Sequence, residues 1–97
     1  GKTDRAAKLY EQALKLDPSG VDAMTGLGYA SLDRGRVPLA LSFFKKALGQ
    51  APSFAPAVFG LAEAHRAAGA DQDALEHYKR YVSISPSGPE VHAAQRQ

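Results

Sequence analysis

Apolar side chains recur along this chain at intervals of three and four residues, and short segments rich in proline and glycine interrupt them. From Ala6 to Leu14 they stand at i, i+3, i+4, i+7 and i+8, the stripe of an amphipathic helix. Proline and glycine mark the ends of such segments. The pattern predicts helices over residues 3–16, 21–33, 38–50, 55–67 and 72–84, and the beginning of another over 89–97.

Helix caps and turns can also be assigned from residue type. Thr3, Ser19 and Asp71 are expected to be N-caps, because their side-chain oxygens can accept the free N–H groups of a first turn. Gly35 and Gly69 stand where a helix ends in a short turn, and both are expected to have positive φ.

The helix pattern repeats with a period of 34 residues. When residues 21–54 are shifted onto 55–88, ten of the 34 positions are identical, against roughly two or three expected by chance. The chain therefore divides into the second half of one unit (1–20), two full units (21–54 and 55–88) and the opening of a fourth (89–97). The identical pairs are Ala23/Ala57, Gly26/Gly60, Leu27/Leu61, Ala30/Ala64, Gly35/Gly69, Ala40/Ala74, Leu41/Leu75, Lys45/Lys79, Pro52/Pro86 and Ser53/Ser87.

The residues that recur resemble the tetratricopeptide repeat (TPR) family. The motif positions are Met24, Leu27, Gly28, Gly35, Ala40, Phe44, Ala47 and Pro52. The resemblance implies a single all-α domain of antiparallel helix–turn–helix hairpins, stacked into a right-handed α-solenoid. Small residues at Gly28 and Ala40 are expected to let the two helices of a hairpin approach closely.

Five positions depart from the family pattern. Met24 and Val58 replace a tryptophan-like residue. Ser31 and His65 replace a tyrosine, and Tyr81 stands where a small alanine is usual. The packing between helices is therefore expected to open or shift around Tyr81.

Composition excludes several other classes of protein. The 97 residues contain no cysteine, carry a net charge of +2 and include no apolar run of the ~20 residues that a membrane span needs. His65, His77 and His92 have no helical partner at metal-ligand spacing. We expect no enzyme, no cofactor and no membrane partner. Localisation stays open, with the cytoplasm slightly favoured.

The family resemblance implies that the first helix of each repeat lines a concave groove. A peptide or partner protein with apolar side chains and some basic character is expected there, in a scaffold or adaptor role. The family's carboxylate clamp for chaperone peptides is not expected, because its positions hold Thr25, Tyr29, Pro56 and Gly60. The expected peptide-binding residues are Asp22, Thr25, Tyr29, Leu32, Asp33, Phe59, Glu63, Arg66 and Glu90.

Two alternatives remain open at this point. The first helix lacks the partner that usually precedes it, so it could support homo-oligomer formation or dock on another domain. The opposite face carries Lys8, Lys15, Lys45, Lys46, Lys79 and Arg80 and could meet RNA. Nucleic acid is the less favoured partner, since no aromatic side chains alternate with these lysines.

Overall fold

The computed structural model describes residues 1–84 and consists there of five helices without a strand. They are α1 (Lys2–Leu16), α2 (Val21–Asp33), α3 (Val37–Gln50), α4 (Ala55–Ala67) and α5 (Asp71–Ile84). Every predicted boundary agrees within one residue, because prolines and glycines end these helices locally. The helix predicted over 89–97, with Glu90 and His92, lies outside the described residues.

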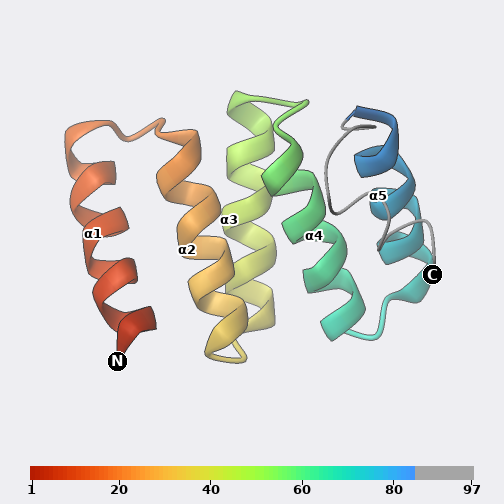
Figure 1. Cartoon of the computed structure of the whole chain (residues 1–97), viewed down its shortest axis with the longest axis horizontal. Coiled ribbons are helices and arrows are strands. Elements are labelled where there is room, and N and C mark those ends of the chain that lie inside the picture. The colour runs from red at the N-terminus through yellow and green to blue at the C-terminus, as the bar shows by residue number, and fades with distance from the viewer. Residues whose placement is uncertain (85–97) are drawn as a thin grey trace.

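The helices follow one another in a row, each packed on the next (Figure 1). In addition, α2 contacts α4, so the first helices of the two full units lie against each other. Neighbouring helices are antiparallel hairpins, and the all-α repeat architecture is confirmed. None of the helices within residues 1–84 is long and apolar enough to cross a membrane.

The predicted side-chain caps are wrong. Gly20, not Ser19, is the N-cap of α2, because the backbone N–H and hydroxyl of Ser19 donate to the Asp17 carboxylate at 3.2 and 3.0 Å. These two hydrogen bonds form a local turn, so the Ser19 side chain is not available to cap the first turn of α2. Thr3 and Asp71 lie inside the first turns of α1 and α5.

Both turn glycines were predicted correctly. Gly35 has φ +73° and Gly69 has φ +79°, and these are the positive-φ residues of the described chain. A Cβ atom added at either position would have no atom beyond its chain neighbours within 4 Å. The turns therefore need glycine for its backbone conformation alone.

The centre of the core is the Phe44 ring, which is fully buried between two glycines. A Cβ on Gly28 of α2 would lie 2.6 Å from this ring, and a Cβ on Gly60 of α4 only 2.3 Å. Tyr10 of α1 covers Gly26 in the same way, at 2.3 Å. The close approach expected at Gly28 is thus made by an aromatic ring inserted between successive first helices.

Tyr81 fits the stack without a gap at its position. It is 4% exposed and packs against Val58, which is fully buried, and against Phe59. Valine occupies a position where the family usually has a much larger residue, so the space it leaves accommodates the tyrosine ring.

Candidate peptide-binding face

Tyr29 joins α2 to α4. Its ring meets the edge of Phe44 with centroids 5.0 Å apart and planes at 76°, and its hydroxyl donates to the Pro56 carbonyl at 2.8 Å. Packing on one side and a hydrogen bond on the other hold the half-buried ring in one orientation. This fixed ring is the centre of the face formed by the two first helices.

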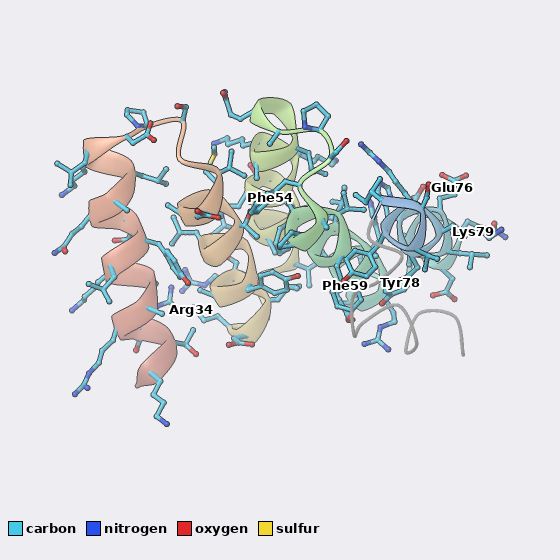
Figure 2. All side chains as sticks on the ribbon, turned by 45° about the horizontal axis from the view of Figure 1, so that its top comes forward. Arg34, Phe54, Phe59, Glu76, Tyr78 and Lys79 are labelled. Atoms are coloured by element: carbon cyan, nitrogen blue, oxygen red, sulfur yellow. The ribbon has the colours of Figure 1, made fainter. Side chains whose placement is uncertain are left out.

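Phe59 occupies the corresponding side of α4 and packs toward α5. Its ring lies 5.8 Å from Tyr78 and 5.1 Å from Tyr81, and Figure 2 shows it beside Tyr78. The Tyr78 hydroxyl is buried and has no hydrogen-bond partner among the described residues. Burial and the nearby Glu63 carboxylate raise the pKa of this phenol. Phe59 remains half-buried and presents part of its ring to solvent.

The charged residues of this face remain accessible. Arg66 donates to Glu63 at 2.8 Å, with 58% of the arginine and 25% of the glutamate side chain exposed. That hydrogen bond raises the pKa of the Arg66 guanidinium. Asp22 is exposed, and the exposed Asp33 accepts a hydrogen bond from Thr3 at 3.3 Å. We call Asp22, Tyr29, Asp33, Phe59, Glu63 and Arg66 together the α2–α4 face.

Two predicted ligand-facing residues point inward instead. Thr25 is only 5% exposed, and its hydroxyl has no partner among the described residues. It lies one turn before Tyr29 on α2. Leu32 is half-buried and packs on the core cluster that contains Phe44. Glu90 lies outside the described residues.

A cavity of about 270 Å³ between α1 and α2 was missed by the sequence analysis, which assigned ligand contacts to first helices alone. Tyr10 and Tyr29 contribute its aromatic lining, and Gly26, without a side chain, leaves room for the Tyr10 ring. The full lining is Lys2, Thr3, Ala6, Tyr10, Gly26, Tyr29, Ala30 and Asp33.

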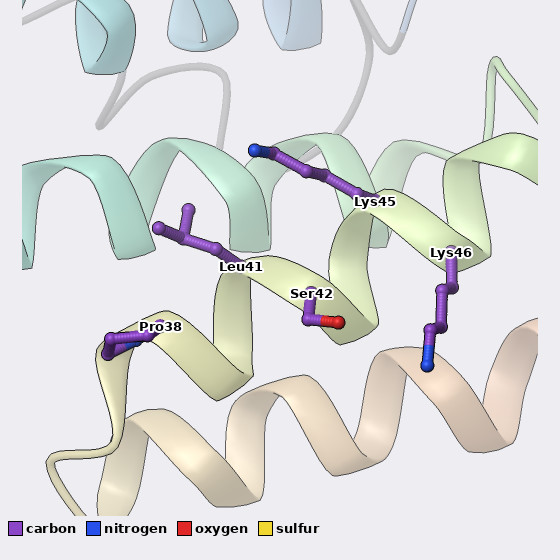
Figure 3. A pocket seen from close by; sticks show the side chains of 5 residues that line it. All are labelled: Pro38, Leu41, Ser42, Lys45 and Lys46. Atoms are coloured by element: carbon purple, nitrogen blue, oxygen red, sulfur yellow. The ribbon is translucent and has the colours of Figure 1, made fainter.

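A second, open hollow of about 520 Å³ follows one stripe of α3 (Figure 3). Its lining is Pro38, Leu41, Ser42, Lys45 and Lys46, at helical spacing. The Lys46 ammonium lies 5.9 Å from the centre of the Phe43 ring, a cation–π contact. A single helix forms this hollow, so it offers a ligand no opposing wall.

The His65 and His77 rings stack between α4 and α5, with centroids 5.1 Å apart and planes at 27°. The Nδ1 atom of His77 lies 2.8 Å from the Asp73 carbonyl oxygen. Burial, His77 and Lys45 together lower the pKa of His65, against the opposing charge of Asp73. Within residues 1–84, no group of three or more histidine or carboxylate side chains could hold a metal ion.

Comparisons with known proteins point to one family. Two family models, both described as tetratricopeptide repeat, match residues 1–56 and 31–97. No curated protein matches the chain.

Several solved structures share the fold. The first TPR of Spaghetti (RPAP3), bound to the HSP90 peptide SRMEEVD, is 23% identical with a TM-score of 0.88 over 99% of this chain and 76% of its own. A yeast Sti1 TPR2B-domain:pHsp70 complex is 20% identical with a TM-score of 0.89, over 98% and 78%. MamA from MSR-1 is 27% identical with a TM-score of 0.77, and 88% of this chain spans 49% of that chain.

The exclusion of a carboxylate-clamp chaperone partner is wrong. Two structures with this fold are, by their descriptions, complexes with an HSP90 peptide and with pHsp70. The exclusion rested on side chains at four positions, of which Thr25 is buried and Gly60 is covered by the Phe44 ring. Buried positions do not meet a ligand directly, so their residue types exclude no partner.

Proposed function

The chain belongs to the tetratricopeptide repeat family, and from this premise we propose that it is a protein-interaction module that binds a peptide or partner protein across the α2–α4 face. Repeats of this kind bury their apolar faces against one another and leave an extended surface for a ligand. In this chain the proposed surface lies along the contact between α2 and α4. The proposed role in a larger protein is that of a scaffold or adaptor.

The observation that carries the proposal is the fixed Tyr29 ring, on a face that also carries the exposed side chains of Asp22 and Arg66. Its contacts with Phe44 and Pro56 hold it before any ligand arrives. Asp22 lies two turns before Tyr29 on the same helix, and Arg66 lies on α4 with more than half of its side chain exposed. A preordered aromatic ring loses little conformational entropy on binding, which favours affinity.

The structures that share the fold support the same class of function. The Spaghetti (RPAP3) domain is described as bound to a seven-residue HSP90 peptide. A peptide on the α2–α4 face would pack apolar side chains against Tyr29 and Phe59. Its polar groups would meet the Glu63–Arg66 pair.

The test begins with selection of peptides from a display library on the immobilised chain, with SRMEEVD added as one defined sequence. The selected peptide is then titrated by fluorescence anisotropy against Arg66→Ala and Phe59→Ala. We expect each substitution to weaken binding at least about tenfold, a loss of about 1.4 kcal/mol.

The matched control is Lys79→Ala, because Lys79 is exposed on the outer side of α5 (Figure 2). Thermal melting confirms that each variant is folded. If Arg66→Ala and Phe59→Ala bind the selected peptide with the same affinity as the wild type, the ligand binds elsewhere than the α2–α4 face.

A second candidate function is self-association through α1. Leu16 is 90% exposed and Leu9 is 66% exposed, both on the same helix. Light scattering over a concentration series tests this directly, and Leu16→Lys should shift any dimer toward monomer. A chain that is monomeric at every concentration removes this candidate.

A further inference from the structure

Two histidines face each other across the hairpin of α4 and α5. His65 of α4 and His77 of α5 are both half-buried, and their rings stack with centroids 5.1 Å apart and planes at 27°. The Nδ1 atom of His77 lies 2.8 Å from the Asp73 carbonyl oxygen, which can only accept a hydrogen bond. Nδ1 of His77 therefore carries a proton already, and Nε2 is the nitrogen that takes up a further one.

The surroundings of the pair make its protonation unfavourable. Burial, His77 and Lys45 of α3 lower the pKa of His65 below its ordinary value of 6.5, and Asp73 of α5 opposes them. Among the described residues, no charge of α2, the remaining neighbour of α4, contributes to this pKa shift. Two imidazolium rings at the stacking distance would repel each other beside the Lys45 ammonium.

The preceding hairpin has the same architecture without a titrating pair. The positions 34 residues before His65 and His77 hold Ser31 of α2 and Phe43 of α3. The Ser31 hydroxyl donates to the Leu27 carbonyl of its own helix at 2.8 Å, and Phe43 packs on the cluster that contains Leu27. Packing of the two helices in a hairpin therefore does not require histidine at these positions.

Helix α5 also supports one residue of the α2–α4 face. The Phe59 ring packs on Tyr78 at 5.8 Å and on Tyr81 at 5.1 Å, and Tyr78 follows His77 directly in the chain. A change in the contact between α4 and α5 at the histidine pair therefore reaches the aromatic rings that hold Phe59.

We propose that the His65–His77 pair is a pH-sensitive contact, in which protonation of both rings in mildly acidic solution loosens α5 from α4 and removes the support of Phe59. The separated rings bind protons more tightly than the stacked rings do, so a falling pH favours the loosened form. Histidine is suited to such a contact because its charge changes near neutral pH. The effect on ligand binding rests on the function proposed for the α2–α4 face, whereas the loosening of α5 does not.

The double variant His65→Ser/His77→Phe tests the contact, because it gives this hairpin the residue pair of the preceding one. Amide hydrogen exchange is measured on the wild type and the variant at about pH 7.5 and about pH 5, on either side of the ordinary histidine pKa. The rates are expressed as protection factors, which remove the intrinsic effect of pH on exchange.

Acidification should lower the protection factors of α5 in the wild type at least about tenfold relative to those of α2 and α3. The α2–α3 hairpin is the internal control, and in the double variant α5 should keep its protection at both pH values. An equal fall of α5 protection in both proteins, or an equal fall over all five helices, would overturn the proposal. Circular dichroism melts confirm that the double variant is folded.

A second measurement does not depend on the double variant. The imidazole proton signals of His65 are followed by NMR over the same pH range in the wild type and in His77→Asn, which replaces the facing ring by a neutral side chain. The pKa of His65 should rise toward its ordinary value in the variant, because a positive neighbour is removed. An identical titration in both proteins would show that the rings do not sense each other and would overturn the proposal.

Peptide binding at the two pH values tests the step to the α2–α4 face. The affinity of the selected peptide should fall on acidification at least about tenfold more in the wild type than in His65→Ser/His77→Phe, which keeps every other titrating group. Equal losses in both proteins would overturn the link to Phe59. A library that yields no peptide counts against the proposed function, and hydrogen exchange then still decides the pH-sensitive contact.

Discussion

The substitution Gly60→Ala tests the arrangement on which the α2–α4 face depends, the Phe44 ring inserted between α2 and α4. A Cβ on Gly60 would lie 2.3 Å from that ring, closer than van der Waals contact allows. Gly49→Ala is the matched control, because Gly49 is also helical and a Cβ there meets no atom within 4 Å.

Both substitutions share one favourable effect. Alanine restricts the unfolded chain and favours a helix by about 0.5–1 kcal/mol relative to glycine. Gly60→Ala adds overpacking in a filled core, which costs about 1–3 kcal/mol. The Gly49 variant should therefore exceed the Gly60 variant in free energy of unfolding by about 1–3 kcal/mol.

Urea unfolding followed by far-UV circular dichroism measures this difference. Phe44→Leu provides the second arm of a double-mutant cycle, since a smaller side chain makes room for the added methyl group. The penalty of Gly60→Ala should shrink in that background. Equal stability of the Gly60 and Gly49 variants, with no coupling to residue 44, would refute the inserted ring.

Three further substitutions test separate parts of the structure. Tyr78→Phe should leave the free energy of unfolding unchanged or raise it by up to about 1 kcal/mol in urea titrations, because it removes a buried hydroxyl without a partner among residues 1–84; a clear loss would show that the hydroxyl is bonded. Gly35→Ala should lower the free energy of unfolding by about 1–2 kcal/mol, since alanine is strained at φ +73°, and an unchanged urea midpoint would contradict the turn. For His65, the folded-state pKa is lowered, so the unfolded imidazole binds a proton first and stability falls as pH decreases below about 6.5. Thermal melts across this range should show a smaller pH dependence in His65→Asn, and an identical dependence would contradict the burial of His65.

The helices could be predicted from the sequence because their signals are local. Pro38 and Pro56 lie in first turns, and Gly35 and Gly69 end two helices with positive φ. Each signal acts through the backbone of its own neighbourhood, so no knowledge of the tertiary structure is needed. The capping predictions failed where a side chain had two local choices, as at Ser19, whose hydroxyl donates to Asp17.

The binding face could be predicted only in part, because burial depends on the neighbouring helix. Thr25 and Tyr29 lie one turn apart on α2, yet Thr25 is buried and Tyr29 is half-exposed. The hydrogen bond from Tyr29 to Pro56 has no signature in residue type or spacing. The cavity lined by Tyr10 was not predicted, because it depends on how α1 and α2 pack against each other.

The most direct test of the proposed function is a map of backbone amide chemical shifts on adding the peptide selected from the display library. The changes should concentrate at Tyr29, Phe59 and Arg66 on the α2–α4 face. Changes centred on the outer residues Lys46 and Lys79, with the α2–α4 face unaffected, would contradict the account.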